Sequence, residues 1–184
     1  EQGSVRFKGQ EITGLKASKR ANLGIVRSFQ IPRPFRSMSI IGNLLIPMEY
    51  AASDRGEQGA LRDRAMEFLE LVGLQDRADE NSSNLTQIDL RRLELARALS
   101  AKPSLLLSDE SMAGLSSSEV DEILDILLAL NERGVAVIMI EHIMRAVMKF
   151  SERIVVLDAG KIIADGSPDE IVANPDVERA YLGE

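Results

Sequence analysis

The sequence predicts an α/β fold in which parallel strands alternate with helices, and two apolar runs carry this prediction. Residues 105–107 are three leucines, and Asp109 and Glu110 follow them closely. This pattern is typical of a buried parallel strand whose carboxyl end lies at a ligand-binding crevice. Residues 135–140 form a second apolar run, rich in β-branched residues, and His142 follows it. The acid pair and the histidine are therefore expected at the tips of neighbouring strands.

Composition limits the possible classes of protein. The chain has 184 residues, 45% of them hydrophobic, which suffices for one sizeable core or one domain with a helical insertion. A formal charge of −7 argues against non-specific nucleic-acid binding, because that binding depends on neutralising phosphates. The chain has no cysteine, which excludes a disulfide framework and a thiolate metal site. No apolar run approaches the length of a membrane span.

One short strand is predicted at residues 24–30, before a mostly helical part of the chain. Pro32 and Pro34 end this strand, because proline lacks a backbone donor and has a fixed φ. Residues 36–50 look like a helix entry and an apolar helix surface, and 61–72 place their apolar residues on one helical face.

The carboxyl half has clear element boundaries. A third helix is stopped by Pro103, and Ser116 with Glu119 forms a capping box for the helix between the two apolar runs. Residues 154–164 are predicted to be a hairpin around a glycine-containing turn. Residues 167–170 start a further helix with a cap, a proline and a box glutamate.

Six motifs follow one another along the chain. They are Arg27-Ser28-Phe29-Gln30, residues 91–99, residues 105–110, Ala113-Gly114-Leu115-Ser116, Glu141-His142 and the tail 174–184. Their order resembles the Q-loop, signature helix, Walker B motif, D-loop and switch histidine of the ATP-binding subunit of an ATP-binding cassette (ABC) transporter. The tail resembles that of the branched-chain amino acid importer group. Any one motif is weak evidence, but six in order are specific.

The resemblance implies a P-loop NTPase fold, the ABC ATPase core, with an inserted helical subdomain. Residues 1–31 would belong to the core, residues 32–99 to the helical subdomain with the signature region, and residues 100–184 to the rest of the core and the C-terminal helices. No phosphate-binding loop G-x-x-x-x-G-K-[ST] occurs in these 184 residues. We therefore expect an amino-terminally truncated core, with weak nucleotide binding and no measurable ATPase in the isolated chain.

The resemblance also implies roles for single residues. Asp109 would hold Mg²⁺ through water, and Gln30 would contact the metal and the attacking water. Glu110 would polarise that water, and His142 would hydrogen-bond the γ-phosphate. Such roles suit phosphoryl transfer, which is mostly positioning and charge stabilisation. The residues expected to contact ATP from the signature region and the D-loop are Leu85, Thr86, Gln87, Ile88, Asp89 and Gly114.

The signature region departs from the pattern of the family. Residues 85–89 read Leu-Thr-Gln-Ile-Asp where the family has Leu-Ser-Gly-Gly-Gln or a near variant. Ile88 replaces a glycine whose missing side chain lets a helix amino terminus approach the γ-phosphate. Asp89 adds a negative charge that stabilises the helix start but repels phosphate. Thr86 and Asp89 would also cap this helix.

Two functions remain open at this point. The first is the ATP-binding and ATP-hydrolysing subunit of an importer, most similar to those for branched-chain amino acids, with ATP and Mg²⁺ as cofactors. Its partners would be permease subunits and a second ATP-binding subunit, without nucleic acid, at the cytoplasmic face of the membrane. The second is a degenerate, non-hydrolytic cassette that docks a sister subunit or a permease. A cassette ATPase of translation or DNA repair is disfavoured by the tail and the acidic charge.

Three expectations concern the surface, and the first has two interpretations. The apolar residues of 40–48 are either core or a docking surface for a permease helix. Arg91 and Arg92 are expected on a solvated helix face, paired with nearby acids. An unpaired sheet edge and exposed apolar surface are expected wherever the sheet lacks strands.

Overall fold

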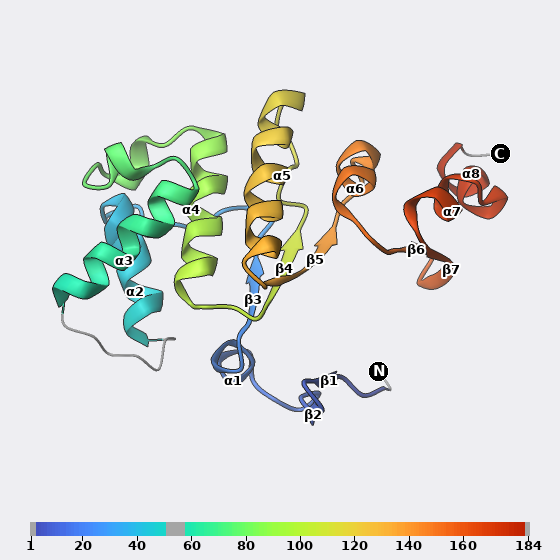
Figure 1. Ribbon diagram of the computed structural model, residues 1–184, viewed down its shortest axis with the longest axis horizontal. Helices are drawn as coiled ribbons and strands as arrows, with labels where there is room; N and C mark the ends of the chain where they lie inside the picture. Colours follow the sequence, from blue (N-terminus) through green and yellow to red (C-terminus); the bar gives the residue numbers. More distant parts are fainter. Residues whose placement is uncertain (1–2, 51–57, 183–184) are drawn as a thin grey trace. The chain divides into compact units, whose positions relative to one another are not determined.

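The computed structural model describes residues 3–50 and 58–182, in two units that divide after Ile140 (Figure 1). The elements of the first unit are β1 (Arg6–Phe7), β2 (Gln10–Glu11), α1 (Ala17–Asn22), β3 (Ile25–Ser28), α2 (Ile40–Tyr50), α3 (Gln58–Leu71), η1 (Gln75–Arg77), η2 (Ser82–Asn84), α4 (Gln87–Ser100), β4 (Leu105–Asp109), α5 (Ser117–Glu132) and β5 (Ala136–Ile140). Those of the second unit are α6 (Met144–Phe150), β6 (Ile154–Asp158), β7 (Lys161–Gly166), α7 (Pro168–Val172) and α8 (Pro175–Leu182).

A parallel sheet of order β3-β4-β5 is the centre of the first unit, which confirms the predicted strand and helix alternation. The register pairs Ser28 with Ser108 and Asp109 with Ile140. Helix α4 packs against β3 and α5 packs against β5. Both serines are buried, whereas Ile138 and Ile140 are 51% and 53% exposed. Strand β5, an outer strand of this sheet, therefore has two exposed apolar side chains.

Helices α2, α3 and α4 pack on one another and form the helical part of the first unit (Figure 1). Ile40, Ile41, Leu44 and Met48 of α2 are at most 2% exposed. They therefore belong to the core, and the alternative that these four residues form a docking surface is wrong. The physical reason is that the apolar side of α2 is covered by helices of the same chain.

Helix α2 begins later than residue 36, the predicted start. Asn43 explains the difference, because its side chain binds the main chain of Phe35. Its Oδ1 accepts from the Phe35 N–H at 2.7 Å, and its Nδ2 donates to the Phe35 carbonyl at 3.2 Å. These bonds hold a turn ahead of Ile40, where the helix starts. Helix α1 and the β1-β2 hairpin were not predicted.

Both predicted capping boxes are confirmed. The Ser116 N–H donates to Oε2 of Glu119 at 2.8 Å, and the Ser116 hydroxyl accepts from the Glu119 N–H. Ser167 and Glu170 make the same pair of bonds at the start of α7. Each box satisfies two backbone donors that a helix start otherwise leaves unpaired.

The second unit has its own small core. Strands β6 and β7 form the predicted antiparallel hairpin, with a turn between Asp158 and Lys161. Its core consists of Ile154, Ala164, Ile171 and Val177, with partly buried neighbours from α6 and the hairpin. Among the described helices of both units, none has the length and apolar character needed to cross a membrane.

The assignment of α2 to the core can be tested by shortening one isoleucine. We expect Ile40→Ala to lower the free energy of unfolding by roughly 2–5 kcal/mol, because it leaves a cavity in a packed interior. The matched control is Ile31→Ala, since Ile31 is 68% exposed and its change should stay within about 0.5 kcal/mol. Chemical denaturation measures both. Equal losses in the two variants would contradict the assignment.

Candidate functional site

The carboxyl ends of β3 and β4 bring Gln30 and Glu110 together. The Gln30 side-chain amide donates from Nε2 to Oε2 of Glu110 at 2.5 Å. Glu110 has a φ of +43°, a left-handed conformation that few residues other than glycine adopt. Its N–H donates to the carbonyl of Ile140 at 2.9 Å, which helps to hold this conformation. Two of the predicted site residues are thus in direct contact.

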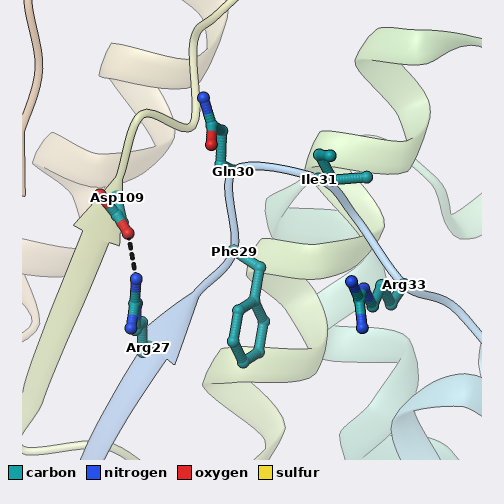
Figure 2. Close-up of a pocket in the computed structure, with 6 residues that line it drawn as sticks. All are labelled: Arg27, Phe29, Gln30, Ile31, Arg33 and Asp109. Atoms are coloured by element: carbon teal, nitrogen blue, oxygen red, sulfur yellow. Dashed lines mark hydrogen bonds and ion pairs between the residues drawn. The ribbon is translucent and has the colours of Figure 1, made fainter.

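Asp109, the last residue of β4, carries the second acid of the site. Its carboxylate accepts a hydrogen bond from the guanidinium of Arg27, which lies on β3 (Figure 2). The guanidinium of Arg27 also lies 5.7 Å from the ring centre of Phe29. These side chains belong to an open pocket of about 350 Å³, lined by Arg27, Phe29, Gln30, Ile31, Arg33 and Asp109.

Asp109 and Gln30 have oxygen donors of the kind that Mg²⁺ prefers. Mg²⁺ usually takes one or two protein oxygens and keeps several waters or substrate phosphates. Among the described residues, no group of three or more His, Cys, Asp or Glu converges in a manner suited to a metal ion. The two oxygens at this pocket fit a metal bound mainly through water and phosphate, and Arg27 would have to release Asp109 to admit it.

The signature region forms the start of α4, and Thr86 is its N-cap. The Thr86 hydroxyl accepts from the Asp89 N–H at 3.3 Å, as the sequence predicts. The Asp89 carboxylate is buried and binds Arg77 at 2.8 Å and Arg92 at 3.3 Å. Its charge is therefore compensated by two guanidinium groups of the same chain. Leu85 and Ile88 are half-buried.

Gln87 and Gly114 bring the signature region and the D-loop together. The Nε2 atom of Gln87 lies 3.4 Å from the carbonyl oxygen of Ala113. Gly114 has a φ of +79°, and a Cβ at this position would lie 2.8 Å from the same Nε2. The positive φ would strain any residue other than glycine, and a Cβ here would also displace the flexible end of the Gln87 side chain.

Arg91 was expected on a solvated helix face, and this expectation is wrong. The residue is 6% exposed, and its guanidinium donates to the carbonyls of Phe29, Gln30 and Ala113. Arg92 does pair with acids, as expected, through Asp89 and Glu122. Nothing local in the sequence distinguishes the two arginines, because the partners of Arg91 are main-chain atoms far away along the chain.

His142 is the second residue of the second unit and comes two residues after the end of β5. It is exposed and lies in the loop that precedes α6. Its place at the site stays a prediction. His142 comes two residues after Ile140 in the sequence, and Ile140 of β5 pairs with Asp109 of β4.

Comparison with known proteins decides the family. The model of the ABC transporter family matches residues 1–113, and that of the branched-chain amino acid ATP-binding cassette transporter matches residues 161–184. The chain is 38% identical over 195 residues to the high-affinity branched-chain amino acid transport ATP-binding protein LivG of Escherichia coli (strain K12), covering 99% of this chain and 76% of the relative. The chain belongs to the ABC transporter family.

Other relatives and solved structures agree with this ABC cassette assignment. The chain is 34% identical to the probable branched-chain amino acid transport ATP-binding protein LivG of Archaeoglobus fulgidus, over 100% of this chain and 75% of the relative. A nucleotide-free ATP-binding cassette from an ABC transporter superposes with a TM-score of 0.87 at 26% identity, covering 100% of this chain and 78% of that chain. The ADP conformation of the cassette MJ1267 gives 0.86 at 27% identity with the same coverage. The P-loop NTPase fold expected from the motifs is thereby confirmed.

The compensation of Asp89 in this ABC cassette can be tested by removing its charge. We expect Asp89→Asn to lower the free energy of unfolding by about 1–3 kcal/mol, because Arg77 and Arg92 lose their counter-charge at a largely buried position. The control is Asp79→Asn, whose ion pair with Arg62 is exposed and should contribute about 0–1 kcal/mol. Thermal and urea unfolding measure both. If Asp89→Asn is as stable as the control variant, the pairing of Asp89 with Arg77 and Arg92 contributes little to the free energy of unfolding.

Proposed function

We propose that this chain is the ATP-binding and ATP-hydrolysing subunit of a membrane importer for branched-chain amino acids. The contact between Gln30 and Glu110 at the ends of β3 and β4 is the observation that carries the proposal. It joins the amide that we propose as the water-positioning group to the carboxylate that we propose as the base, in a chain whose relatives are named as branched-chain amino acid transport ATP-binding proteins.

The proposed roles follow from the position of each side chain. Glu110 polarises the attacking water, and Gln30 orients that water through the amide that already reaches the Glu110 carboxylate. Asp109, through water, and Gln30 would hold Mg²⁺, which when bound would offset negative charge on the phosphates. His142 donates a hydrogen bond to the γ-phosphate.

The signature region and the D-loop are proposed to contact ATP held by a second subunit. Thr86 offers a hydroxyl at the start of α4, where backbone N–H groups favour an anion. Gln87 and Gly114 lie together beside it. The residues proposed for this contact are Leu85, Thr86, Gln87, Ile88, Asp89 and Gly114.

The proposed domain layout follows the function. Residues 1–31 and 100–184 belong to the ATPase core, and residues 32–99 form the helical subdomain inserted between β3 and β4. The packing of α2, α3 and α4 on one another supports this division.

The proposed partners are permease subunits and a second ATP-binding subunit at the cytoplasmic face of the membrane. A permease contact is favoured at the segment after β3, where three apolar side chains are exposed. Phe29 is 53% exposed, Ile31 is 68% exposed and Phe35 is 42% exposed. Large apolar side chains gathered in one exposed segment are typical of interaction sites.

Hydrolysis tests the main proposal. We expect the chain extended upstream of Glu1 by a phosphate-binding loop of this family to hydrolyse ATP in the presence of Mg²⁺. Glu110→Gln should lower that rate about 100-fold or more, because the neutral amide cannot polarise water as the carboxylate does. The control is Glu122→Gln on α5, whose carboxylate pairs with Arg92 of α4 and not with Gln30. Normal turnover in Glu110→Gln would remove Glu110 from its role.

Ile88 favours a second candidate, the non-hydrolytic cassette. A β-branched side chain replaces glycine at the start of α4, where a phosphate would approach the helix. Such a cassette would dock a permease or a sister subunit without turning over ATP at this signature. The contact between Gln30 and Glu110 argues against it, since it preserves the hydrolytic arrangement.

Restoring the glycine separates the two candidates. In the same extended chain, we expect Ile88→Gly to raise ATP hydrolysis about tenfold if the isoleucine blocks the phosphate, which corresponds to about 1.4 kcal/mol. Ile88→Leu is the control, because it keeps a large side chain. Asp89 stays unchanged, since it binds Arg77 and Arg92. Equal hydrolysis rates in the unsubstituted chain, Ile88→Gly and Ile88→Leu would show that Ile88 does not block the phosphate, and Ile88 would no longer favour the second candidate.

A further inference from the structure

Helix α4 carries a buried carboxylate that binds the segment after β3. Oε1 of Glu94 accepts from the Phe29 N–H at 2.9 Å, and Oε2 accepts from the Arg33 N–H at 3.2 Å. The two N–H groups lie at either end of a five-residue segment, and one carboxylate joins them. Glu94 is 7% exposed, so these bonds form away from bulk water.

Two arginines of the same helix complete this contact. Arg91 donates to the carbonyls of Phe29 and Gln30, and Arg97 donates to the carbonyl of Arg33 at 2.9 Å. Residues spaced three apart along a helix lie on neighbouring positions of its surface. Arg91, Glu94 and Arg97 therefore act on one stretch of main chain from one side of α4.

Burial disfavours the charged form of Glu94, and its bonding partners favour that form. Burial raises the pKa of the Glu94 carboxyl above its ordinary value, while the N–H groups of Phe29 and Arg33 and the charges of Arg97 and Arg91 lower it. Burial also lowers the pKa of Arg97, against the raising effect of Glu94. A charge buried at such a cost must have bonding partners, and its partners here are backbone donors of the segment after β3.

The segment has few other ways to hold its shape. Pro32 and Pro34 have no N–H to donate, and the ladder between β3 and β4 ends at Ser28. The bonds to α4 therefore set the path of the main chain from Phe29 to Arg33.

Gln30 lies inside this held segment, and its side chain reaches Glu110 at 2.5 Å. Arg91 also lies 3.4 Å from the carbonyl oxygen of Ala113, three residues after Glu110. Helix α4 thus contacts the main chain on both sides of the pair formed by Gln30 and Glu110.

We propose that Glu94 is a positioning residue that holds Gln30 against Glu110 by binding the N–H groups of Phe29 and Arg33. Its importance for hydrolysis rests on the function proposed above. The contact itself requires no nucleotide and can be measured without one.

Nuclear magnetic resonance of the 184-residue chain tests the proposal. The Gln30 side-chain amide signals are assigned by their loss in Gln30→Ala, and their position without the Glu110 bond is taken from Glu110→Ala. We expect Glu94→Ala to move these signals to the position found in Glu110→Ala. The Phe29 and Arg33 backbone amides should exchange with solvent about tenfold faster or more, because each loses a charge-assisted hydrogen bond.

Two further variants make the result specific. Glu94→Gln keeps one acceptor oxygen and has the same shape, so one of the two backbone amides should stay protected while the other exchanges faster. Glu122→Ala removes a carboxylate that pairs with Arg92 of the same helix, and it should leave the Gln30 signals in place. If Glu94→Ala does not fold, Glu94→Gln decides the question alone, because loss of one of the two bonds should also move the Gln30 signals toward their position in Glu110→Ala.

Gln30 signals that stay unchanged in every Glu94 variant that folds would overturn the proposal. The outcome is independent of ATP hydrolysis by the extended chain. Loss of the Gln30 contact with normal hydrolysis would overturn the importance of Glu94 for the reaction. No hydrolysis in any extended chain would count against the proposed function and leave the measured contact intact.

Discussion

The parallel register of β3 and β4 is the constraint on which the site depends. Ser28 and Ser108 are partners in this register, and Gln30 and Glu110 each follow two residues later. The two segments therefore leave the sheet at the same level. The bonds from α4 to the segment after β3 and the left-handed backbone of Glu110 then allow the two side chains to meet. A shift of one residue would turn alternate side chains to the opposite face and separate the pair. The buried Leu106 and Ser108 on the covered face make such a shift costly.

Most charged side chains of helix α4 are directed into the protein. Through them the helix contacts both the signature region and the segment after β3. Asp89 at its start is neutralised by Arg77 and Arg92, so the altered signature residue is a structural member of the helix. Further along, Glu94 binds main-chain N–H groups. Removing either partner would leave a buried charge without compensation, which costs more than the pair contributes.

The parts of the fold that could be predicted have signals within a few residues. The strand before Asp109 and the capping box at Ser116 are local patterns of apolar and polar residues. The apolar face of α2 was ambiguous, because a sequence shows that such a face must be covered but not by which chain. Arg91 was misjudged for a related reason: its acceptors are carbonyls, which every residue has. Helix α1 has no buried residue, so no apolar pattern marked it.

The two prolines after β3 also affect how the strand edge behaves toward other chains. A sheet edge recruits foreign strands through regularly spaced main-chain donors and acceptors. Beyond Ser28, Pro32 and Pro34 have no N–H, and the N–H groups of Phe29 and Arg33 are bonded to Glu94, so this segment offers no regular row of donors that could lengthen the ladder. The mouth of the pocket is thereby protected from unwanted β-pairing while its apolar side chains stay accessible.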